Sequence, residues 1–87
     1  MKELIFFKSL DCEYCRMAEK YLNQAIQKNP EYQKIPLQII DEDANEDISM
    51  KYDYNFIPAF FVDGIKVHEG IATRGQVEAI LSAAYGT

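Results

Sequence analysis

Residues 4–18 read LIFFKSLDCEYCRMA, and this segment governs the expected architecture of the chain. Leu4–Phe7 is a continuous apolar run, which is typical of a strand buried on both faces. After a polar connection, apolar residues recur at spacings of three and four, which predicts an amphipathic helix. Its expected apolar stripe comprises Tyr14, Met17, Ala18, Tyr21, Leu22, Ala25 and Ile26. Cys12 and Cys15 therefore lie at the junction between a buried strand and a helix.

The rest of the chain alternates between the two kinds of element. The first helix is expected to end at Asn29-Pro30, and Leu37–Ile40 is a second buried strand. The acidic segment 41–47 leads into a short helix around Ile48–Tyr52, where its carboxylates oppose the positive end of the helix dipole. Two further strands, Ala59–Val62 and Ile65–His68, flank an Asp-Gly pair, the strongest short signal of a hairpin.

A last helix is expected after Thr73-Arg74-Gly75-Gln76, which has the pattern of a capping box. The order is then β-α-β-α-β-β-α in a single domain, residues 1–87. The first two strands are joined through a helix and should be parallel with a right-handed crossover, whereas the last two form an antiparallel hairpin. We therefore predict an α/β fold, in which a four-stranded mixed sheet carries three helices distributed over both faces.

Composition excludes several classes of function. The net charge is −5, and the nine Lys and Arg residues are scattered, so a nucleic-acid partner, which requires a basic face, is not expected. No segment approaches the roughly 20 apolar residues of a membrane span, and the first residues do not resemble a signal peptide. We expect a cytoplasmic monomer that needs no cofactor. Cysteine pairs in that compartment tend to be catalytic or metal-binding.

The spacing of the cysteines assigns them different roles. A disulfide that closes so small a loop restricts the unfolded chain very little, so a purely structural bridge is a poor explanation. Cys12 should be exposed at the helix tip, where free backbone N–H groups stabilise a thiolate, the attacking species. Cys15 should lie close to the buried stripe. We predict that Cys12 is the nucleophile that forms a mixed disulfide and that Cys15 is the resolving thiol.

Four charged neighbours should tune this chemistry. Lys8 and Arg16 would lower the pKa of the Cys12 thiol, whereas Asp11 and Glu13, which flank it directly, would raise it. We give the direct neighbours more weight. A less stabilised thiolate means a more reducing couple, which predicts a reductase and not an oxidase.

Three segments together resemble the thioredoxin and glutaredoxin family. Phe6-Phe7-Lys8 with residues 12–18 is similar to the glutaredoxin active-site segment, whose hallmark is Cys-Pro-Tyr-Cys, with Glu13 in place of the proline. Residues 56–64 are similar to the thioredoxin stretch that carries a cis-proline, and residues 70–77 to its approach to the last helix. The resemblance implies a thioredoxin fold of glutaredoxin size and thiol–disulfide oxidoreductase activity in electron transport.

The same resemblance implies further site residues and partners. Pro58 would have a cis bond beside the cysteines, the Ile57 backbone would bind an extended substrate chain, and Tyr14 would line the substrate groove, unless it begins the apolar stripe of its helix. The implied partners are disulfide-containing proteins. The electron donor is either a reductase or glutathione. The resemblance does not single out glutathione, because the Thr and Asp of the glutathione-binding pattern are replaced here by Phe56 and Arg74.

Two alternative functions use the same cysteines. One is a glutathione-dependent glutaredoxin. The other is binding of a metal or an iron–sulfur cluster through the cysteine pair, since soft thiolates suit such ions. Copper chaperones also carry two cysteines at this spacing between a first strand and helix, but their order is β-α-β-β-α-β, and no strand is expected here after the last helix. A closed structural zinc site needs four ligands, and Cys12, Cys15 and His68 supply at most three.

Overall fold

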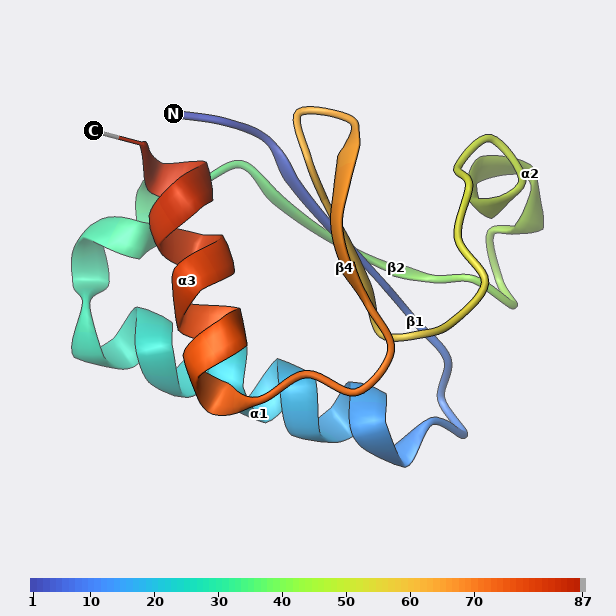
Figure 1. The fold of residues 1–87 in the computed structure, drawn as a ribbon, viewed down its shortest axis with the longest axis horizontal. Helices are drawn as coiled ribbons and strands as arrows, with labels where there is room; N and C mark the ends of the chain where they lie inside the picture. The colour runs from blue at the N-terminus through green and yellow to red at the C-terminus, as the bar shows by residue number, and fades with distance from the viewer. Residues whose placement is uncertain (87) are drawn as a thin grey trace.

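The computed structural model describes residues 1–86, and its elements alternate in the expected order (Figure 1). They are β1 (Leu4–Lys8), α1 (Glu13–Lys28), the short 3₁₀ helix η1 (Pro30–Lys34), β2 (Leu37–Asp41), α2 (Glu46–Ser49), β3 (Ala59–Val62), β4 (Ile65–Glu69) and α3 (Arg74–Tyr85). Within residues 1–86, no helix has both the length and the apolar character that crossing a bilayer requires.

The four strands form one mixed sheet in the order β2-β1-β3-β4. The central strand β1 pairs in parallel with β2, where Leu4 lies opposite Leu37, and antiparallel with β3, where Leu4 lies opposite Val62. β4 pairs antiparallel with β3 through a hairpin, in which Asp63 and Gly64 have φ values of 49° and 81°. The sheet, its directions and the Asp-Gly turn confirm the predicted α/β fold.

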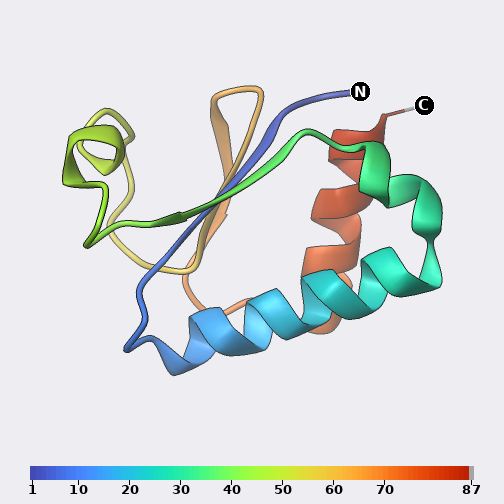
Figure 2. The same cartoon turned by 180° about the vertical axis from the view of Figure 1, so that it is seen from behind.

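Alternation along β1 and β3 divides the core into two clusters. Leu4, Phe6 and Phe60 point to the face covered by α1 and α3, and the rings of Phe6 and Phe60 stack with centroids 4.8 Å apart. Phe7 and Phe61 point to the opposite face. Side chains between residues 48 and 54, from α2 and the segment after it, cover this face. Figure 2 shows α1 and α3 together on one side of the sheet and α2 on the other. Both central strands are therefore buried on both faces, as their apolar runs predict.

The buried stripe of α1 lies on the predicted face but is narrower than predicted. The residues that face the sheet are Cys15, Ala18, Leu22 and Ala25. Tyr14 and Met17 are 49% and 43% exposed, so the interpretation of Tyr14 as the first residue of the apolar stripe is wrong. Tyr21 and Ile26, at the margins of this narrow stripe, are partly buried against the core.

The second helix also begins earlier than predicted. The Asn45 carbonyl accepts the N–H groups of Ile48 and Ser49, each at 3.0 Å, so the helical turn forms over Glu46–Ser49. Tyr52 leaves the helix because its ring packs between two aromatic residues of the sheet, with centroid distances of 5.1 Å to Phe7 and 4.9 Å to Phe61. This contact with the sheet ends the helix before Tyr52, where the sequence predicted it to continue.

Candidate functional site

Cys12 is the N-cap residue of α1, and Cys15 lies in its first turn. The connection from β1 turns sharply, with the Cys12 N–H donating to the Ser9 carbonyl at 3.2 Å. The Cys12 Sγ accepts a hydrogen bond from the N–H of Cys15 at 3.0 Å. This sulfur is therefore the capping acceptor, which in most N-caps is a serine or aspartate oxygen. The Cα atoms of the two cysteines are 5.1 Å apart, and their sulfurs form a disulfide.

The two cysteines differ strongly in burial. Cys15 is 1% exposed and belongs to the core cluster between the sheet and the helices. Cys12 is only partly buried at the margin of that cluster. A second molecule can therefore reach the Cys12 sulfur but not the Cys15 sulfur, which is the arrangement that the spacing predicts.

The loop before β3 faces this sulfur pair. The Ile57–Pro58 peptide bond is cis, and the Ile57 carbonyl oxygen lies 4.0 Å from the Cys12 Sγ. Pro58 is fully buried, and its carbonyl accepts the N–H of Gly70 at 2.9 Å. Within residues 1–86, the Ile57 N–H has no backbone partner. The fold thus brings Ile57 and Pro58 against a cysteine that precedes Ile57 by 45 residues.

The charged residues predicted to tune Cys12 have partners of their own. The Lys8 ammonium forms an ion pair with Glu19 at 2.9 Å, so its charge is partly neutralised before it acts on the sulfur. The Arg16 guanidinium donates to the Leu10 carbonyl at 2.9 Å and thereby fastens the β1–α1 connection. Asp11 and Glu13 are exposed on either side of Cys12. Their influence on the thiol stays a prediction.

Exposed apolar side chains occur in the segments that adjoin the sulfur pair. Leu10 precedes Cys12 and is 70% exposed, Tyr14 follows it and is 49% exposed, and Phe56 precedes Ile57 and is 65% exposed. Ile71, in the β4–α3 connection, is 62% exposed. The predicted substrate-binding residues Tyr14 and Ile57 thus belong to segments that also expose other apolar side chains.

Glu69, at the end of β4, is a contact that sequence reasoning missed. Its Oε1 accepts the N–H groups of Asn55 at 2.8 Å and Phe56 at 3.3 Å, and its Oε2 accepts from the Lys66 ammonium at 2.7 Å. The hydrogen bond from Lys66 and the amide of Asn55 hold the pKa of the Glu69 carboxyl below its usual value. The contacts to the loop span 13 and 14 residues, so no local pattern marks Glu69 as their acceptor.

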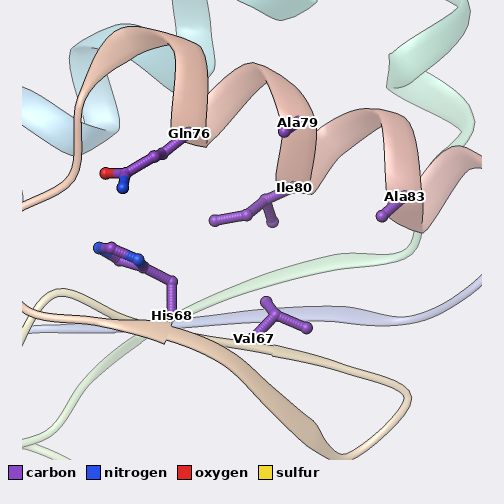
Figure 3. Close-up of a pocket in the computed structure, with 6 residues that line it drawn as sticks. All are labelled: Val67, His68, Gln76, Ala79, Ile80 and Ala83. Atoms are coloured by element: carbon purple, nitrogen blue, oxygen red, sulfur yellow. The ribbon is translucent and has the colours of Figure 1, made fainter.

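A separate cavity of about 300 Å³ lies between β4 and α3 (Figure 3). Val67 and His68 line it from the strand, and Gln76, Ala79, Ile80 and Ala83 line it from the helix. The His68 Nε2 is 3.0 Å from the Ile71 carbonyl oxygen. This cavity shares no lining residue with the cysteine site. In the part of the chain that the structure describes, no three His, Cys, Asp or Glu side chains are grouped so that they could hold a metal ion.

Comparison with known proteins agrees with this geometry. A family model described as a thioredoxin domain matches residues 2–82. None of the curated proteins compared with the sequence matches it. Similar solved structures include a malarial protein, with a TM-score of 0.75, 15% identity and 97% of each chain covered. An uncharacterized thioredoxin-like protein from Clostridium perfringens has a TM-score of 0.71 and 24% identity, over 97% of this chain and 71% of that chain.

The zinc-bound form of human ERp44 is a third similar structure, with a TM-score of 0.61 and 21% identity. The match covers 92% of this chain but only 24% of ERp44, so the likeness concerns about a quarter of that protein. At these identities the three structures show a shared fold. The thioredoxin-type fold and a cysteine pair at disulfide distance are consistent with thiol–disulfide redox chemistry.

Proposed function

Since the chain belongs to the thioredoxin-domain family, we propose that it is a thiol–disulfide oxidoreductase that reduces protein disulfides through Cys12 and Cys15. One observation carries the proposal: an accessible sulfur caps a helix, its partner lies buried one turn further on, and a loop backbone faces both. A structural disulfide would not need one accessible sulfur or a facing loop.

The reaction follows from the difference between the two sulfurs. The Cys12 thiolate attacks one sulfur of the substrate disulfide, forming a mixed disulfide, while the other substrate sulfur leaves as a thiolate and takes up a proton. Cys15 then loses its proton and attacks the Cys12 Sγ. This step releases the second substrate thiol and leaves the Cys12–Cys15 disulfide. The substrate gains two electrons and two protons, and the protein loses them.

The start of α1 stabilises the thiolate of Cys12, which is the attacking species. The Cys15 N–H that now donates to the Cys12 Sγ at 3.0 Å would donate to a thiolate in the reduced protein, where a charged acceptor strengthens the bond. The positive end of the dipole of α1, a 16-residue helix, acts in the same direction. Asp11 and Glu13 oppose both effects, which supports a reducing couple.

An extended polypeptide fits the surroundings of the sulfur pair as substrate. The Ile57 N–H, which has no backbone partner within residues 1–86, provides a main-chain donor beside Cys12, in the manner of strand addition. The exposed Tyr14 and Phe56 would contact apolar side chains that flank the substrate disulfide. We propose that the protein acts as a monomer in a reducing compartment such as the cytoplasm, where a reductase or glutathione regenerates the dithiol.

Reduction of insulin disulfides by the dithiol form tests this function. Wild type should turn over with dithiothreitol as donor, and Cys12→Ser should be inactive because it lacks the nucleophile. Cys15→Ser should accumulate a mixed disulfide with the substrate through Cys12, visible by mass spectrometry under non-reducing conditions. Turnover by Cys12→Ser at the wild-type rate would exclude the proposed role of this cysteine.

A further inference from the structure

We infer that Glu69 is a positioning residue, whose carboxylate holds the loop of residues 55–57 in the conformation that receives an extended substrate chain beside Cys12. The inference rests on the proposed function and adds to it a residue from the far end of the hairpin. It follows from the contacts of this carboxylate and from the lack of other partners for the amides that it binds.

The Glu69 carboxylate accepts hydrogen bonds from two successive amides of the loop. Oε1 accepts from Asn55 and Phe56, the two residues immediately before Ile57. Ile57 in turn places its carbonyl oxygen 4.0 Å from the Cys12 Sγ. The path from Glu69 to the reactive sulfur therefore crosses a single backbone segment of three residues.

No other group within residues 1–86 replaces these two hydrogen bonds. The N–H groups of Asn55 and Phe56 have no other hydrogen-bond acceptor there. The next anchor along the chain is the bond from the Gly70 N–H to the Pro58 carbonyl at 2.9 Å, which fixes the loop after Ile57 but not before it. Removing the carboxylate would free the amides of Asn55 and Phe56, whereas Tyr54 before them and Pro58 after them would stay attached.

The position of Glu69 is itself well defined. It is the last residue of β4, opposite Ala59 in the ladder with β3, so its backbone is held by the sheet. Its second oxygen pairs with Lys66 at 2.7 Å, which leaves Oε1 to the two loop amides. A charged acceptor makes stronger hydrogen bonds to amides than a neutral one, which suits a residue that must order an exposed loop.

The expected effect separates protein substrates from small ones. A main-chain contact to Ile57 forms with an extended polypeptide, whereas a small aromatic disulfide needs the Cys12 sulfur alone. Glu69→Ala should raise the KM for insulin by at least about fivefold, the scale of one ordinary hydrogen bond between the substrate and the Ile57 backbone. The rate constant kcat for insulin and the rate with dithionitrobenzoate should stay within about twofold of wild type, because the sulfur pair is untouched.

The experiment compares Glu69→Ala with three further variants. Glu69→Gln retains a neutral acceptor and should give an intermediate KM. Lys66→Ala removes the ion pair but leaves the carboxylate, and it should remain near wild type. Glu78→Ala, an exposed glutamate on α3, is the matched control and should not change the KM. If Glu69→Ala does not fold, Glu69→Gln carries the comparison. An unchanged KM in the folded Glu69 variants would overturn the inference.

A second readout does not depend on catalysis. Amide hydrogen exchange, followed by NMR, should speed up at Asn55 and Phe56 in Glu69→Ala and stay unchanged at Gly70, whose partner is the Pro58 carbonyl. Unchanged exchange at Asn55 and Phe56 would refute the positioning role. If wild type itself does not reduce insulin, the proposed function fails, while the exchange rates still decide whether Glu69 orders the loop.

Discussion

Replacing Leu22 with alanine tests the register of α1, which decides which cysteine is buried. Leu22 is fully buried on the stripe that also holds Cys15 and Ala18. The substitution removes three carbons, worth about 0.8 kcal/mol each in transfer free energy, and the cavity that remains adds to this loss. We expect Leu22→Ala to lower the free energy of unfolding by about 3 kcal/mol, out of a total of about 4–13 kcal/mol for a domain of this size.

Met17→Ala is the matched control on the same helix. Met17 is 43% exposed, and alanine is at least as good a helix former, so we expect a loss below about 1 kcal/mol. Urea denaturation of the oxidised proteins measures both values. At a slope near 1.5 kcal/mol/M, the midpoint of Leu22→Ala should fall by about 2 M. A larger loss for Met17→Ala than for Leu22→Ala would mean that the helix is rotated, and the assignment of the exposed sulfur to Cys12 would fail with it.

Two further substitutions test contacts elsewhere in the fold. Thr73→Ala removes the oxygen that accepts the Gln76 N–H at 3.1 Å in the α3 capping box. It should lower the free energy of unfolding by about 1 kcal/mol, or the melting temperature by about 4–8 °C. Ser82→Ala, at an exposed position of the same helix, is the control and should lower neither. Burial and the bond from its hydroxyl to Glu42 raise the pKa of Tyr54. Tyr54 therefore keeps its proton in the folded protein above about pH 10, where the unfolded chain loses it, so its contribution to stability is present below that pH and is lost as pH rises. Between about pH 9 and pH 11, the urea midpoint of Tyr54→Phe should fall less than that of wild type. An equal fall would show that folding does not raise the pKa of the Tyr54 hydroxyl.

Local patterns predicted the elements because each one rests on short-range chemistry. The apolar run at Leu4–Phe7, the Asp63-Gly64 turn and the Thr73–Gln76 capping box all form in the structure. Each depends on residues within a few positions of one another, so their signals are visible along the chain. The different burial of Cys12 and Cys15 follows in the same way, from a spacing of three residues at a helix start.

Contacts between distant segments were not predictable from such patterns. The exposure of Tyr14 and Met17 depends on how much of the α1 surface the core covers, and the early end of α2 depends on the packing of Tyr52 against Phe7 and Phe61. The pairing of Lys8 with Glu19 depends on the path of the β1–α1 turn. In each case a tertiary contact outweighs a local preference of smaller energy.

The amino-acid sequence alone determined that this chain builds a mixed α/β sheet and carries two cysteines of unequal exposure at the start of a helix, because strand burial, turns and caps are encoded by neighbouring residues. The family resemblance, and no local pattern, placed Ile57 and Pro58 beside those cysteines, and tertiary structure alone decided that Glu69 holds the loop before them. The approach of Ile57 to Cys12 and the hold of Glu69 on the loop before it join segments that meet only when the sheet has formed, since hydrogen bonds and packing between them require all four strands in register.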